Sequence, residues 1–131
     1  MEPNVESRIS ERLSALHAHL HGKRSSGART YVAGDDVVVV VLEESFTPAE
    51  QALVDRGEAE GIQELRRRLR RVMADDFGAI VEQATGRRVR SYISDTDVAE
   101  QVSIEVFLLG APLEDMSGFE TAGDSDGPGR S

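Results

Sequence analysis

Residues 29–53 read RTYVAGDDVVVVVLEESFTPAEQAL, and this stretch decides the fold. Val37 to Leu42 is a run of six apolar residues, five of them β-branched, which predicts a strand at the centre of a sheet. Residues 29–33 are predicted to pair antiparallel with it through a turn at Gly34-Asp35, because glycine tolerates a positive φ. Thr47 is then predicted to cap a helix, with Pro48 at its first position and Glu50 completing a capping box.

The spacing of apolar residues in the rest of the chain predicts two further helices, a connector and a second hairpin. Apolar residues at spacings of three and four predict a helix over residues 4–21 and one long helix over residues 62–81, the main lid on the sheet. A polar connector is predicted at residues 23–28. Alternation predicts a second hairpin with strands at residues 87–94 and 102–109 and a loop at residues 95–101.

These elements predict an α+β fold with a four-stranded antiparallel sheet built from two hairpins. The helices should gather on one face of it, and the order along the chain is α-β-β-α-α-β-β. Residues 1–110 form a single domain in this interpretation. Residues 111–131, rich in acids, glycine and serine, form a disordered tail.

The second hairpin also allows a prediction of register and of faces. Putting the apolar sets on one face requires partner numbers with an odd sum, and a sum of 195 sets Arg90 opposite Glu105. The opposite face of the sheet would then carry a mixed set of polar and aromatic side chains. A face of that kind is often a dimer interface, so a homodimer is expected. The residues expected there are Arg88, Arg90, Tyr92, Glu105 and Phe107.

Composition and charge exclude several classes of protein. No cysteine is present, which removes disulfides, thiolate metal sites and thiol nucleophiles, and no secretory signal is visible at the N-terminus. The longest apolar run is far shorter than the roughly 20 residues that span a bilayer. A soluble, cytoplasmic protein is therefore expected. The formal charge of −9 disfavours nucleic acid as a partner, although acids crowd residues 35–60 and arginines crowd residues 61–90.

Candidate catalytic and metal-binding groups are few. His17 and His21 share a helix face, but no third ligand is evident, so a solvated helix edge is the preferred interpretation. Asp95-Thr96-Asp97 lacks the glycine and the closing glutamate of a calcium loop, and no serine lies in a nucleophile elbow. The sequence therefore predicts a protein that is not an enzyme and that needs no cofactor or metal.

The arginine run is the sharper anomaly, because Arg66 and Arg70 fall on the border of the apolar stripe of the long helix. Two explanations stay open. Either these arginines pair with acids such as Glu43, Glu44 or Glu50, or their two guanidinium groups bind an anion. Arg66 and Arg70 are therefore the candidate ligand-binding residues. Nucleic-acid binding through this helix is weaker, since no aromatic residues lie between the arginines.

Several of these segments, taken in order, resemble the MpsC family of a bacterial sodium-translocating, membrane-potential-generating system. They are the first helix and its connector, RTYV at residues 29–32, the valine strand, FTPAEQAL at residues 46–53, the arginine-rich helix ending in Thr85-Gly86, and VFLL at residues 106–109. The likeness covers residues 5–110. The chain departs from the family pattern in the connector, where a Gly-Pro pair is expected and residues 23–28 read KRSSGA.

The resemblance implies a soluble accessory or regulatory binding protein beside a cation- or bicarbonate-linked membrane system. A membrane-transport protein is the partner it suggests, and it implies no catalytic residues. The alternative is a binding protein or enzyme for a small anion, bicarbonate or phosphate, that uses the Arg66 and Arg70 edge.

Overall fold

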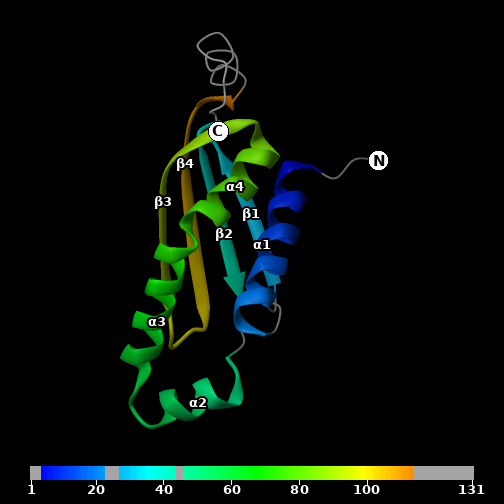
Figure 1. Cartoon of the computed structure of the whole chain (residues 1–131). Helices are drawn as coiled ribbons and strands as arrows, with labels where there is room; N and C mark the ends of the chain where they lie inside the picture. The colour runs from blue at the N-terminus through cyan, green and yellow to red at the C-terminus, as the bar shows by residue number, and fades with distance from the viewer. Residues whose placement is uncertain (1–3, 23–26, 44–45, 114–131) are drawn as a thin grey trace.

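The valine run forms an interior strand of a four-stranded antiparallel sheet, as predicted. A computed structural model describes residues 4–22, 27–43 and 46–113. In it the strand order is β1-β2-β4-β3, with all neighbours antiparallel. The strands are β1 (Gly27–Ala33), β2 (Val37–Glu43), β3 (Arg87–Asp97) and β4 (Val102–Pro112). Figure 1 shows α1, α3 and α4 over one side of this sheet and α2 beyond one of its ends.

The first two helices lie where the sequence predicted them, and a side chain caps the N-terminus of each. In α1 (Val5–His21) the Asn4 side chain accepts a hydrogen bond from the Ser7 amide at 2.7 Å, and Gly22 ends the helix at φ 78°. In α2 (Pro48–Asp55) Thr47 Oγ1 accepts from the Glu50 amide at 3.2 Å, and the Glu50 carboxylate accepts from the Thr47 amide at 2.9 Å. The predicted capping box is confirmed.

The prediction of one long helix over residues 62–81 is wrong, because the segment folds as α3 (Ala59–Val72) and α4 (Ala74–Thr85). The two helices meet at Met73, whose ψ of 11° leaves the helical region. The side that faces the sheet also differs from the predicted stripe. Leu65 and Val72 are exposed, whereas Ile62, Arg66 and Arg70 are buried. Arg66 and Arg70 can point inward because each forms an ion pair with a carboxylate there, Arg66 with Glu50 and Arg70 with Glu105.

The assignment of the two sheet faces was also wrong. Tyr92 packs against the core under the helices, and Phe107 and Glu105 are fully buried. In β4 the alternating set Val102, Ile104, Val106 and Leu108 is wholly apolar, whereas Ser103, Glu105, Phe107 and Leu109 are mixed, so the sequence pattern favoured the wrong set. Aromatic contacts accompany the burial of the mixed set: Tyr92 stacks on Phe107 at 4.7 Å and lies 5.9 Å from Phe77 of α4, between ring centroids. The main core consists of Ile9, Leu13, Val38, Val40, Leu42, Phe77, Val81, Ala84, Phe107 and Leu109.

The predicted register of the second hairpin is wrong, because the numbers of paired residues sum to four more than the predicted 195. Tyr92 lies opposite Phe107 and Ser94 opposite Glu105, a sum of 199, so Arg90 does not face Glu105. The strands run to Asp97 and from Val102, and the loop is therefore shorter than predicted. The odd sum holds from Ser91 to Asp97. It fails at Val89, which lies opposite Leu109, because a bulge there turns Val89 toward the core.

The predicted order of elements is confirmed, with one helix more than expected: α-β-β-α-α-α-β-β. The expected boundary of the tail at residue 111 falls inside β4. Pro112 pairs with Arg87, and the Leu113 amide donates to the Gly86 carbonyl at 2.8 Å. The remainder of the predicted tail, residues 114–131, lies outside the described residues. So does most of the predicted connector, residues 23–26.

Candidate functional site

Arg66 and Arg70 project from α3 into the protein, where each binds a carboxylate. They are only 1% and 4% exposed. Arg66 Nη2 lies 3.0 Å from Glu50 Oε2, and Arg70 Nε lies 3.1 Å from Glu105 Oε2. Each guanidinium also lies over an aromatic ring: Arg66 5.1 Å from the centroid of Phe46, and Arg70 5.3 Å from that of Phe77. Both arginines therefore pack in the interior, at positions of α3 that apolar residues would usually occupy.

Glu105 is the acid at the centre of the arrangement. It is completely buried on β4, and it accepts a hydrogen bond from the Tyr92 hydroxyl as well as from Arg70. Burial raises the pKa of Tyr92 and the Glu105 carboxylate raises it further, so the phenol keeps its proton. A buried carboxylate needs such donors, because an uncompensated charge in the interior is costly.

His17 and His21 border the same arginines from α1. Their ring centroids are 4.3 Å apart, which confirms that they share one helix face. The prediction of a solvated helix edge is wrong, because that face is turned inward and His17 is only 2% exposed. Burial lowers the pKa of His21 to about 3, helped by the positive charge of Arg66 and by His17 and Arg70. His21 is therefore neutral at physiological pH. Within the described ranges its buried Nε2 atom has no hydrogen-bond partner.

We call Arg66, Arg70, Glu50, Glu105 and Tyr92 the arginine cluster. Burial, together with the charge of Arg70, lowers the pKa of Arg66 to about 10, which still leaves it charged at neutral pH. The Glu50 and Glu105 carboxylates already accept hydrogen bonds from Arg66 and Arg70, so they use some of the guanidinium N–H donors that an anion would need. In the part of the chain that the structure describes, no three His, Asp or Glu side chains come together as a metal-binding group.

The sequence predicted one of the two carboxylate partners. Glu50 was among the acids proposed for Arg66 and Arg70, and it binds Arg66. Glu43 instead pairs with Arg29 at 3.2 Å, and Glu44 lies outside the described residues. Glu105 and Tyr92 were missed as partners because they were assigned to the wrong face. The signal that could have found Glu105 is a lone acid within the apolar segment 102–109.

The other charged groups of this region lie at the surface. Arg67 donates to the Asp95 carboxylate at 3.3 Å, and Arg68 pairs with Glu64 at 3.1 Å. The hydrogen bond from Arg67 lowers the pKa of Asp95, and the Thr96 amide adds to this effect. Asp95-Thr96-Asp97 forms the end of β3, and the Asp97 carboxylate accepts from the Glu100 amide of the following turn at 3.1 Å.

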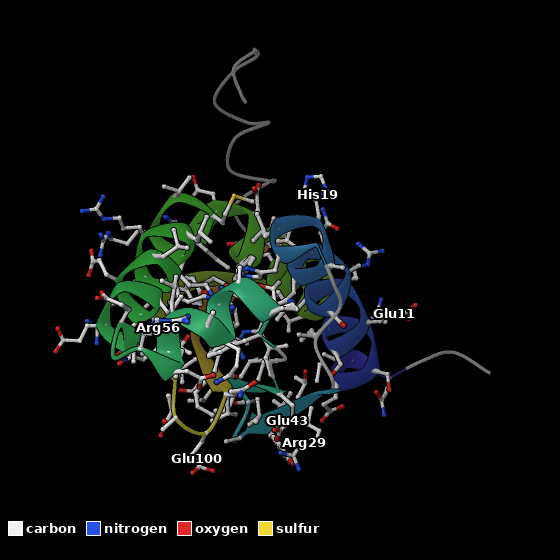
Figure 2. The ribbon with its side chains drawn as sticks, turned by 90° about the horizontal axis from the view of Figure 1, so that it is seen from below. Glu11, His19, Arg29, Glu43, Arg56 and Glu100 are labelled. Atoms are coloured by element: carbon white, nitrogen blue, oxygen red, sulfur yellow. The ribbon has the colours of Figure 1, made fainter. Side chains whose placement is uncertain are left out.

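The second notable feature is the side of the sheet that the helices leave uncovered, which we call the open face. One row across its four strands reads Tyr31, Val39, Val106 and Ile93, and Tyr31 and Ile93 are 52% and 61% exposed. The rows on either side add Ala33, Val37, Leu108 and Ser91, and Arg29, Val41, Ile104 and Asp95. In the end-on view of Figure 2, Arg29 and Glu43 lie side by side at the bottom, on the side away from the helices.

Comparison with known protein families gives a match over nearly all of the described residues. A family model described as "Na+-translocating membrane potential-generating system (MpsC)" matches residues 2–111. The chain belongs to the MpsC family. Neither a curated protein nor a solved structure matches it. The match includes every helix and strand apart from the last residue of β4. The arginine cluster and the open face are thus both features of the MpsC domain in this chain.

The family description connects this MpsC domain with a membrane process. None of its described helices has the length and apolar character that would carry the chain across a bilayer.

Proposed function

We propose that this MpsC-family chain is a cytoplasmic accessory or regulatory binding protein of a bacterial cation- or bicarbonate-linked membrane-potential-generating system. It acts as a homodimer and catalyses no reaction. The observation that carries the proposal is the distribution of its side chains. The reactive side chains Arg66, Arg70 and Glu105 are buried and Tyr92 is partly buried. Arg66 is bound to Glu50, and Arg70 and Tyr92 are bound to Glu105, whereas apolar side chains of the open face are exposed.

A binding role follows from that distribution for a physical reason. Catalysis needs polar groups that can reach a substrate, and a carboxylate held by Arg70 and Tyr92 inside the core is poorly placed for proton transfer. Soluble monomers rarely expose contiguous apolar patches of more than a few hundred Å², and such patches mark interaction surfaces. The family description supports a membrane-transport protein as the physiological partner.

The test is affinity capture from the membrane fraction of the native host, with the tagged protein as bait. Recovery of ion-transport subunits above the level obtained with an unrelated acidic bait would support the proposal. Recovery of no transport subunit under conditions that preserve the complex would refute it.

The second candidate is a binding protein for bicarbonate or phosphate, and one observation favours it. The two imidazoles of α1 are near enough to Arg66 and Arg70 of α3 for these charges to lower the pKa of His21, and the buried His21 Nε2 has no partner among the residues that the structure describes. An anion bound there would stabilise the fold by about 1.4 kcal/mol at ten times its Kd.

A paired melting experiment separates the two candidates. Wild type and the double variant Arg66→Gln/Arg70→Gln are melted with and without bicarbonate or phosphate, and Arg67→Gln/Arg71→Gln on the exposed side of α3 is the matched control. The accessory role predicts no anion-dependent shift in any of the three. A shift present in wild type and control but absent from a folded Arg66/Arg70 variant would establish the anion-binding function instead.

A further inference from the structure

The open face is apolar across the full width of the sheet. Its central row, Tyr31, Val39, Val106 and Ile93, carries no charge, and the row containing Val37 and Leu108 carries none either. Charged residues enter only at the two outer strands and at one end. Ile104 adds a third exposed apolar side chain to Tyr31 and Ile93. Such a surface favours contact with another apolar surface over contact with water.

The size of the open face suits a dimer interface. The sheet has two strands of seven residues and two of 11. With strands about 4.8 Å apart and a rise of about 3.3 Å per residue, its projected area is roughly 570 Å² per copy, so that two copies would cover roughly 1,100 Å². A specific interface needs about 1,000 Å² in total. Flat faces rich in β-branched side chains also pack on one another about 10 Å apart, as in β-sandwiches.

The charges of the face favour one arrangement of two copies. Arg29 on β1 and Asp95 on β3 belong to the same row, which continues through Val41 and Ile104. They lie on opposite outer strands, about 14 Å apart across three inter-strand spacings, and do not meet within one protomer. There Arg29 pairs with Glu43 and Asp95 with Arg67, and all four side chains are about half exposed, so a second copy could still reach them. A two-fold axis parallel to the strands would place Arg29 of each copy opposite Asp95 of the other. An axis across the strands would place each opposite an uncharged residue.

We propose that the open face binds a second copy of this chain, face to face, about a two-fold axis that runs parallel to the strands between β2 and β4. The inference deepens the homodimer of the proposed function and rests on it. A membrane surface suits the face less well. Among the described residues, Glu43, Asp95 and Asp97 lie around it against Arg29 and against Arg90 beside Gly110, and anionic lipids attract clusters of Lys and Arg rather than such a mixed set.

The first experiment measures mass by sedimentation for the full chain and three variants. Ile93→Lys and Ile104→Lys place a charge on the open face at positions that are already partly exposed, so the fold of the protomer should survive. Val72→Lys is the matched control on α3, where the side chain is 78% exposed on the helical side of the sheet. We expect wild type and Val72→Lys at twice the chain mass of 14.3 kDa. The two open-face variants should sediment at the monomer mass, with their circular dichroism unchanged.

A second measurement uses the absence of cysteine from the chain. Ile104→Cys and Val72→Cys each introduce a single thiol, and their rates of alkylation report how accessible the two positions are. In the dimer Ile104→Cys should react at least tenfold more slowly than Val72→Cys. Dilution to the monomer should leave only the small difference expected from their exposures of 38% and 78% in one protomer. Equal rates in a sample shown to be dimeric would place the interface elsewhere.

A charge exchange tests the orientation of the axis. Arg29→Asp and Asp95→Arg should each weaken the dimer, because each brings like charges together across the interface. The combined variant should regain most of the lost affinity. A combined variant no tighter than the weaker single variant would overturn the axis.

The outcomes also separate this inference from the proposed function. A wild type that stays monomeric at concentrations of tens of micromolar, where a stable dimer forms, overturns both the open-face inference and the homodimer. A dimer that survives Ile93→Lys and Ile104→Lys overturns the open-face inference alone. Failure to capture a membrane-transport subunit with a dimeric wild type overturns the accessory role and leaves the interface standing.

Discussion

Replacement of Arg70 by Met should show how strongly the buried arginine cluster holds the fold. Arg70→Met keeps an unbranched apolar stem but removes the charge that lies 3.1 Å from the fully buried Glu105 carboxylate. Removing one partner of a buried ion pair costs about 3–5 kcal/mol, because the remaining charge is uncompensated. If Glu105 instead takes up a proton, the cost at pH 7 is about 3.7 kcal/mol, from an ordinary glutamate pKa near 4.3 and about 1.36 kcal/mol per unit. Both routes give a loss of about 4 kcal/mol.

The assay is urea denaturation followed by circular dichroism at pH 7 and at pH 5. With a slope of about 2 kcal/mol per molar urea, a loss of about 4 kcal/mol lowers the midpoint by roughly 2 M. The deficit should shrink at pH 5, because Glu105 in the variant has a raised pKa in the folded state and its protonation there costs only about 1 kcal/mol. Arg70→Met/Glu105→Gln should recover most of the loss, apart from the contact of Arg70 with Phe77.

Arg68→Met is the control, since Arg68 forms an ion pair of similar length with Glu64 at the surface, where both side chains are at least half exposed. Such a pair contributes about 0–1 kcal/mol. A midpoint for Arg70→Met no lower than that of Arg68→Met would refute the reasoning, as would a deficit of equal size at both pH values.

Three further predictions concern the caps, the C-terminus and the histidines. Thr47→Ala should cost about 1 kcal/mol through loss of the cap of α2, measured by urea denaturation, and an unchanged midpoint would show that the cap contributes nothing. Deletion of residues 114–131, a segment with few apolar residues, should leave the melting temperature unchanged, whereas deletion of residues 111–131 should lower it by removing the pairing of Pro112 with Arg87. His21 has a folded pKa of about 3, below its ordinary 6.5, so the free energy of unfolding should fall as the pH drops below 6.5. The loss from this group is at most about 1.4 kcal/mol per pH unit, and it is smaller than that because His21 is only partly buried. His21→Gln should have a flatter stability profile between pH 6.5 and 5, and identical slopes would contradict the shift.

Local chemistry explains why so much of the fold was predictable. The valine run, the turn at Gly34, and the capping box of Thr47 and Glu50 each depend on residues close in sequence. These contacts determined element type, element order and the antiparallel pairing of each hairpin. The same reasoning failed at Met73, where backbone torsion divides a continuous helical pattern, and in the register of the second hairpin, where a shorter loop and a bulge set the alignment.

The candidate site was only half predictable. The positions of Arg66 and Arg70 on the border of an apolar stripe indicated that they must find acids or an anion, and Glu50 was a correct partner. Glu105 was missed because it belongs to the mixed alternating set of β4, and periodicity favoured the wholly apolar set as the one that faces the helices.

The sequence by itself determined the class of fold, the caps and turns, and the membership of the MpsC family, because these depend on local patterns and on the order of segments. Only the tertiary structure decided which face of the sheet is buried. That choice depends on stacking between Tyr92, Phe107 and Phe77, and on the pairing of Arg70 with Glu105, 35 residues further along the chain. It follows from those long-range contacts that the arginines lie inside and that the valines Val37, Val39 and Val41 line the open face.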